Sequence, residues 1–196
     1  MKQDHPKAAI ELLPMKRLFF STLFALNMLA AGFAYAEKAD ADKPTNVEAD
    51  QMAYDDVRQI NTFTGNVVLT RGTLIMKAHK MVVTQDPAGY QFATLYAGQG
   101  KPASFRQKRD GGENLWIEGE AERIEYDNKA DVAKLFSKAK MRRLEGNKVT
   151  DEVEGEFISY DNRTEFFAVN NTPSDTSKPG AGRVKAVIQP RNEARK

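Results

Sequence analysis

The chain has 196 residues, of which 41% are hydrophobic and 29% charged, which suits one domain of ordinary size and excludes a disordered tail. It contains no cysteine and two histidines, which excludes disulfide frameworks, thiol nucleophiles and cysteine-ligated metal sites and leaves little for imidazole catalysis. The formal net charge is +2, but the N-terminal segment accounts for it.

That N-terminal segment predicts export. Lys16 and Arg17 precede an apolar run at 18–31, which is followed by the small-residue triplet Ala34-Tyr35-Ala36. This order is typical of a secretory signal peptide cleaved after Ala36, and the apolar run is too short for a comfortable membrane span. Residues 1–36 are therefore assigned to a signal peptide, with 1–14 an extension upstream of a second start at Met15. Cleavage removes four basic and two acidic residues and leaves 25 of each.

A polar lead-in at 37–44 is followed by a repeated heptapeptide. The pattern small-x-x-[Ile/Met]-x-Tyr-Asp stands at 49–55, 121–127 and 155–161, with a looser copy at 78–84. A shift of 72 residues superposes the first copy on the second and also brings Phe63, Gly65, Val67 and Leu69 onto Leu135, Ser137, Ala139 and Met141. A repeat of this kind indicates a duplicated supersecondary unit.

Each copy breaks the alternation of its strand. Val47 and Ala49 share one face, whereas Met52 and Tyr54 have the opposite parity. If all four point inward, one extra residue must intervene, as in a β-bulge or a bend of a curved sheet. The Tyr-Asp pairs are followed by Asp or Asn, which indicates turns at the ends of strands.

The remaining segments predict strands in chain order. They lie at 62–70, 73–84, 90–97, 103–108, 115–124 and 183–189, and the first two form a hairpin about Arg71-Gly72. Residues 130–144 also show helical spacing, but the repeat favours a strand with Ala133, Leu135, Ala139 and Met141 on one face. We predict an all-β fold, a single long, curved antiparallel sheet stack or jelly roll at 45–170. A Pro/Gly/Ser-rich loop follows at 171–182, then the strand 183–189 and a basic tail at 190–196.

The residues offer no reactive constellation. His79 lies between Lys77 and Lys80 and is predicted to face solvent, and the carboxylates are scattered with no paired acid and base. We therefore predict no catalytic residue, no metal site, no cofactor and no enzymatic activity. The basic face formed by Lys138, Lys140, Arg142 and Arg143 is interpreted as a solvated surface, with anion binding as the alternative.

Several motifs occur in a fairly specific order. They are the signal peptide, Val47-Glu-Ala-Asp-Gln51, Phe63-Thr-Gly-Asn-Val67, the segment from Gly98 to Gln107 (GQGKPASFRQ), and the recurring Ile-x-Tyr-Asp. Together they make the chain from about Thr45 to Pro190 resemble the OstA-like family of periplasmic lipopolysaccharide transport proteins. Family members usually have Gly where Ser137 stands.

The resemblance implies a V-shaped antiparallel jelly roll whose inner faces hold acyl chains in the periplasm. It also implies a bridge from an inner-membrane export complex to an outer-membrane insertion complex, head-to-tail pairing of protomers, and no nucleic acid partner. The alternative is a periplasmic scaffold or glycan-binding β module with a closed core.

Strand parity then selects the residues expected to touch lipid and partners. The acyl chains of lipid A are expected to contact Val47, Phe63, Val67, Leu69, Leu74, Met76, Phe105, Ile117, Tyr126 and Leu135. The unpaired strand edges that invite pairing by another protomer are expected near Thr45 and Ala49 and near Arg183, Val184 and Gln189.

Overall fold

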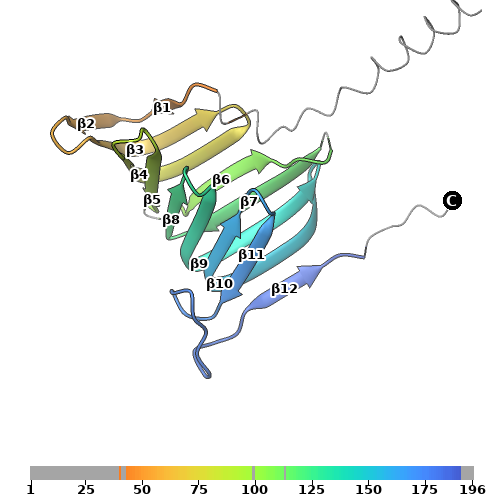
Figure 1. The fold of residues 1–196 in the computed structure, drawn as a ribbon. Coiled ribbons are helices and arrows are strands. Elements are labelled where there is room, and N and C mark those ends of the chain that lie inside the picture. The colour runs from red at the N-terminus through yellow and green to blue at the C-terminus, as the bar shows by residue number, and fades with distance from the viewer. Residues whose placement is uncertain (1–39, 41–42, 99, 113, 191–196) are drawn as a thin grey trace, which may run out of the picture. The chain divides into compact units, whose positions relative to one another are not determined.

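The computed structural model describes residue 40 and residues 43–98, 100–112 and 114–190. The predicted signal peptide, most of the lead-in and the end of the basic tail lie outside these residues. The described part forms one antiparallel sheet of twelve strands, shown in Figure 1. None of its helices is long and apolar enough to cross a membrane.

The strands follow one another closely along the chain. They are β1 (Asn46–Glu48), β2 (Gln51–Asp55), β3 (Ile60–Arg71), β4 (Leu74–Gln85), β5 (Gln91–Tyr96), β6 (Ala103–Lys108), β7 (Leu115–Ala121), β8 (Arg123–Asp127), β9 (Val132–Glu145), β10 (Lys148–Asp161), β11 (Phe166–Asn170) and β12 (Lys185–Ile188).

Four long strands run through two layers. The first half of β3 pairs with β2 and its second half with β1, and β4, β9 and β10 divide their partners in the same way. The first layer therefore contains β2, β5, β8 and β11, and the second layer contains β1, β6, β7 and β12, each completed by halves of the long strands. Figure 1 shows β1 and β2 at one end of the sheet and β11 and β12 at the other.

The bends come from paired left-handed residues that the repeat places at matching positions. In β3 they are Gly65 and Asn66, with φ of 79° and 47°, and in β9 they are Ser137 and Lys138, with φ of 61° and 52°. The ladder shifts register at both points, between 64 and 67 on β3 and opposite 155 and 157 on β10. Ser137 thus adopts a positive φ that glycine tolerates more readily than serine.

An acidic residue of the heptapeptide braces each of these two bends. The Asp50 N–H donates to the Gly65 carbonyl at 2.9 Å, and the Glu122 N–H donates to the Ser137 carbonyl at 3.0 Å. The side chains meet as well, since Asn66 Nδ2 donates to Asp50 Oδ2 at 3.0 Å and Lys138 Nζ lies 2.6 Å from Glu122 Oε1. The hydrogen bond to Glu122 raises the pKa of Lys138.

The aspartate that ends each full copy builds a turn, as the sequence indicates. The carboxylates of Asp55, Asp127 and Asp161 each accept a bond from the backbone N–H three residues later, at 2.9, 2.9 and 3.0 Å. For Asp161 these backbone bonds lower the pKa of the carboxyl group. The aspartates of the Tyr-Asp pairs are therefore structural elements of the turns.

The all-β prediction is confirmed, including the disputed segment at 130–144, which forms most of β9. Ala133, Leu135, Ala139 and Met141 are all buried on its inner face. Two strand predictions are corrected. The expected strand 115–124 is two strands, because the chain bends at Glu122, and the C-terminal strand is shorter than 183–189, covering Lys185–Ile188.

Candidate functional site

Rows of inward side chains cross both layers. In the first layer the ladder pairs bring Phe63, Met81, Leu95, Ile124, Leu135 and Ile158 into one row, and all six are buried. In the second layer the row is Val47, Leu69, Met76, Phe105, Gly119, Met141 and Val153. A Cβ at Gly119 would lie 2.2 Å from the Phe105 ring, so this glycine makes room for the phenyl group.

A cavity of about 200 Å³ lies between the two rows, next to β1 and β3. Its walls are mostly apolar, formed by Val47, Phe63, Leu69, Leu74, Met76, Val83 and Ala93. Its polar groups are Thr45, Asn61, Arg71, Gln91, Tyr126 and Asn128. The lining comes from both layers, so the cavity is an interlayer space that both apolar and polar side chains surround.

Arg71 is the only cation in that lining, and it is buried. Its Nη1 donates to Asn128 Oδ1 and its Nη2 to the Tyr126 hydroxyl, both at 3.1 Å, and the guanidinium carbon lies 5.8 Å from the Tyr126 ring centroid. Arg71 ends β3 in the second layer, whereas Tyr126 lies near the end of β8 in the first layer and Asn128 directly follows that strand. The guanidinium therefore ties the two layers together.

The polar contacts continue behind Tyr126. Its hydroxyl donates to Asp131 Oδ1 at 2.9 Å, and Asn162 Nδ2 donates to the same oxygen at 3.0 Å and to Gln107 Oε1 at 3.2 Å. Burial, with a smaller effect from the Asp131 carboxylate, raises the pKa of Tyr126, which further favours the protonated phenol that donates to Asp131.

Further contacts join the two layers toward the C-terminal end of the sheet, and we call this end the closed side of the molecule. Arg109 forms a hydrogen-bonded ion pair with Glu165, and Arg143 Nη2 donates to the Glu165 carbonyl at 2.8 Å. Arg143 also lies over the Phe167 ring, 5.1 Å from its centroid. The layers are thus joined from Arg71 onward, while Met52 and Tyr54 at the N-terminal end stay exposed.

The structure brings together six of the ten side chains predicted to touch lipid. Val47, Phe63, Leu69, Leu74, Met76 and Tyr126 all line the interlayer cavity. The other four, Val67, Phe105, Ile117 and Leu135, are buried in the core but do not line this cavity. Contact with acyl chains stays a prediction for all ten.

Sequence reasoning missed Arg71, which it treated as part of a turn signal. Strand alternation could have found it. Arg71 follows Leu69 by two residues and therefore points to the same inner face. It also missed β11. The third copy follows the second by 34 residues, and that shift places Phe166–Asn170 on the first half of β9.

The predicted edge residues lie at the ends of the second layer. Thr45 and Ala49 flank β1, Arg183 and Val184 precede β12, and Gln189 follows it; all five are exposed. Within the described residues β1 pairs only with β3 and β12 only with β10, so each keeps one edge without a partner strand. In the first layer β2 and β11 are the corresponding edge strands.

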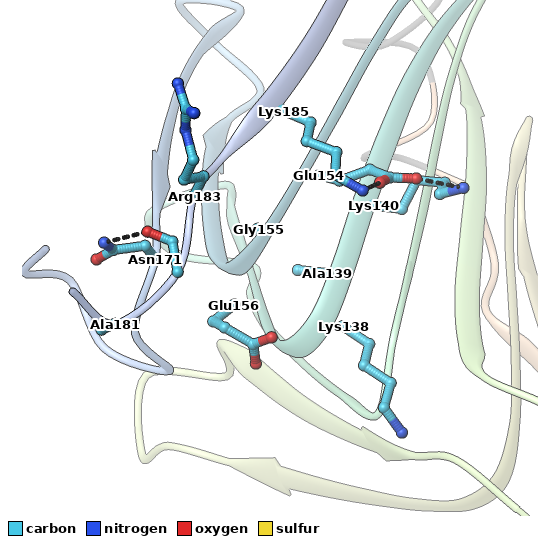
Figure 2. Close-up of a pocket in the computed structure, with 11 residues that line it drawn as sticks. Lys138, Ala139, Lys140, Glu154, Gly155, Glu156, Asn171, Ala181, Arg183 and Lys185 are labelled. Carbon is cyan, nitrogen blue, oxygen red and sulfur yellow. Dashed lines mark hydrogen bonds and ion pairs between the residues drawn. The ribbon is translucent and has the colours of Figure 1, made fainter.

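A separate hollow of about 380 Å³ lies at the bends near the C-terminal end. Figure 2 shows its charged lining, in which Glu154 stands between Lys140 and Lys185. Glu154 Oε1 lies 2.7 Å from Lys140 Nζ, and its Oε2 lies 3.7 Å from Lys185 Nζ. The hydrogen bond raises the pKa of Lys140 and lowers that of Glu154. The described residues contain no cluster of three or more potential metal ligands.

Comparison with known proteins identifies the family. Residues 46–166 match the family described as LptA/(LptD N-terminal domain) LPS transport protein. The chain belongs to this family. It is 35% identical over 145 residues to the lipopolysaccharide export system protein LptA of Escherichia coli K12, covering 74% of each chain. It is 28% identical over 181 residues to LptA of Haemophilus influenzae, covering 92% of this chain and 95% of that one.

A solved member of the family has the same fold. The crystal structure of LptH from Pseudomonas aeruginosa superposes with a TM-score of 0.66 at 26% identity, covering 77% of this chain and 99% of that one. Its description calls LptH the LptA homologous periplasmic component of a lipopolysaccharide transport device. The predicted resemblance and the predicted jelly roll are both confirmed. The relatives are named for export and not for a chemical reaction.

Proposed function

We propose that this protein carries lipopolysaccharide through the periplasm with the acyl chains of lipid A held between its two layers. The observation that supports this most directly is the interlayer cavity, whose lining includes six of the side chains selected by strand parity, five of them apolar and the sixth Tyr126. Membership of a lipopolysaccharide transport family supports the same function. Transport of this kind requires shielding from water and no catalytic group.

The energetic need for shielding is large. Exposing an acyl chain to water costs about 0.8 kcal/mol per methylene, or roughly 9 kcal/mol for a chain of about 12 carbons. The cavity is smaller than the roughly 300–1,000 Å³ of sites that enclose a small-molecule ligand. Loading therefore requires the layers to move apart at the N-terminal end, where Met52 and Tyr54 are already exposed.

A crosslinking experiment tests the inner-face assignment. Photo-crosslinking residues placed at Leu69 and Val68 compare two neighbours on opposite faces of β3, since Leu69 lines the cavity and Val68 does not. Lipopolysaccharide should be captured at Leu69 and not at Val68. Equal capture at both positions would contradict an inner lipid site and favour the closed-core alternative. The same comparison between Val67 and Val68 extends the test deeper into the core.

The edge strands support a bridge built by head-to-tail pairing. The ends differ in sequence, so contact between β1 or β2 of one protomer and β11 or β12 of the next is heterologous and extends into a filament. Inner-membrane and outer-membrane complexes with matching strands would cap the two ends. Deleting 183–196 should shorten the oligomers seen by light scattering as concentration rises. A fixed monomer at every concentration would contradict this assembly.

The export signal completes the proposal. Cleavage after Ala36 would release a mature chain that begins at Glu37 in the periplasm. The intact mass of the protein recovered from that compartment tests it, since a product that retains residues 1–36 would contradict the assignment.

A further inference from the structure

Arg71 combines burial with the lack of a direct ion pair, since the Asp131 carboxylate reaches it only through the Tyr126 hydroxyl. Its exposed fraction is 9%, and it is the only arginine or lysine among the buried residues of the described ranges. None of the ion pairs within those ranges involves it. Burying a cation without an anion carries a substantial desolvation cost. A bound anion would offset that cost.

Three other cations near candidate sites already have carboxylate partners. In the hollow of Figure 2, Lys140 and Lys185 share Glu154, and on the closed side of the molecule Arg109 pairs with Glu165. The protein therefore neutralises these three cations with its own carboxylates, whereas Arg143, which is only partly buried, donates to the backbone carbonyl of Glu165. Arg71 instead meets neutral groups, an amide oxygen and a phenol.

The donors of Arg71 are only partly used. The guanidinium has five N–H donors, of which one on Nη1 serves Asn128 and one on Nη2 serves Tyr126. Its Nε–H is buried and has no hydrogen-bond acceptor in the structure, as is also true of the Nε–H groups of Arg109, Arg123 and Arg143. The nearest carboxylate of this network, Asp131, already accepts from the Tyr126 hydroxyl and from Asn162. A donor surface thus remains for an incoming oxyanion.

We propose that Arg71 binds a phosphate monoester of the lipid headgroup while the attached acyl chains occupy the cavity. The inference rests on the proposed lipid transport function and adds the chemical group that is recognised. Phosphate oxygens match the planar guanidinium fork and form charge-assisted hydrogen bonds with it. The apolar lining residues and the single cation among them fit an amphiphile with an anionic head. Asn128 and Tyr126 hold the guanidinium in place.

The experiment compares two forms of the same lipid. Binding of purified mature protein to lipid A with its phosphates, and to lipid A from which they have been removed, is measured by calorimetric titration in detergent. Wild-type protein should bind the phosphorylated form about tenfold to a hundredfold more tightly. Arg71→Gln should abolish that preference by weakening the binding of the phosphorylated form. Arg58→Gln is the control, because Arg58 is an exposed arginine in the β2–β3 turn.

The other possible results separate failure of the phosphate site from failure of the proposed transport function. Equal wild-type affinity for both lipids, or a preference that survives in Arg71→Gln, overturns the phosphate site and leaves lipid transport standing. Failure of wild-type protein to bind either lipid overturns the proposed function as well. If Arg71→Gln does not unfold cooperatively, Arg71→Lys replaces it and should reduce the preference several-fold, because lysine lacks the fork.

A third titration identifies the source of the phosphate. Inorganic phosphate alone is added to wild-type protein and to Arg71→Gln, and the melting temperature is followed. No difference between them, together with the lipid preference above, assigns the site to a lipid headgroup. A rise in wild-type protein alone assigns it to free phosphate and overturns the headgroup assignment.

Discussion

The first and second full copies of the heptapeptide have the same sequence pattern and the same local structure, yet their environments differ. Both place a strand before a turn closed by an aspartate, and both brace a bend in the neighbouring long strand. Met52 and Tyr54 of the first copy are 58% and 51% exposed, whereas Ile124 and Tyr126 of the second are 0% and 8% exposed.

The difference shows that the repeat builds strands and bends, while position in the sheet decides whether they are covered. Met52 pairs with Phe63 and so points to the inner face, as Ile124 does through its pair with Leu135. β2 is an edge strand, but β8 lies in the middle of the first layer. The exposed copy is therefore free to meet lipid or a second protomer.

Truncating Met52 of the first copy and Ile124 of the second should give the largest difference in the free energy of unfolding. Ile124→Ala should lower the free energy of unfolding by about 2–5 kcal/mol, because it leaves a cavity in a fully packed core. Met52→Ala should cost less than about 1 kcal/mol, because more than half of the side chain is already in water. Urea denaturation measures both, and similar losses would mean that β2 is covered in solution.

Removing the hydroxyls of Tyr126 and Tyr54 should give a smaller difference in stability between the two copies. Tyr126→Phe deprives Arg71 of an acceptor and Asp131 of a donor in a buried site and should cost about 1–3 kcal/mol. The Tyr54 hydroxyl contacts Asp56 and Gln59 at the surface, so Tyr54→Phe should change the stability by no more than about 0.5 kcal/mol. Thermal unfolding of the two variants checks this, and the reverse order would contradict the assigned burial.

Placing glycine at the β9 bend and serine at the β3 bend should change the stability in opposite directions. Ser137→Gly should stabilise the protein by roughly 0.5–1 kcal/mol, because glycine adopts a positive φ without steric cost. Gly65→Ser should destabilise by more than that, since its Cβ would also lie 2.2 Å from Asp50 Oδ2. Denaturation midpoints compare both variants with wild-type protein. A loss of stability in Ser137→Gly would show that the serine hydroxyl stabilises the bend.

The smallest expected effect is the loss, at acidic pH, of the stabilisation that Asp161 gives to the turn after the third copy. The pKa of Asp161 is lowered, mainly by the backbone N–H of Thr164. Its contribution to stability is therefore full above the ordinary aspartate pKa of about 3.9 and is lost as the pH falls through the lowered folded value. The stability difference between wild-type protein and Asp161→Ala should shrink below about pH 4. A constant difference down to about pH 2 would contradict the shift.

The sequence predicted most of the inner face, and the structure shows why that was feasible. Alternation is a local property, so Leu69, Met76 and Leu135 were assigned to the interior from parity alone, and the structure buries them. The repeat settled the ambiguous segment, because Val132 to Glu145 inherits the strand of its earlier copy. The division of 115–124 was missed, although the parity break in the second copy marked it.

By itself the sequence determined the β fold, the positions of its bends and turns, and which side chains face inward, because these depend on residues a few positions apart. Only the tertiary structure decided which inward residues surround a cavity and which copy of the repeat stays uncovered. Both depend on how the second layer lies over the first. The contacts of Arg71 with Tyr126 and Asn128 span 55 and 57 residues, and no local pattern encodes a contact between strands that meet only after the sheet has folded.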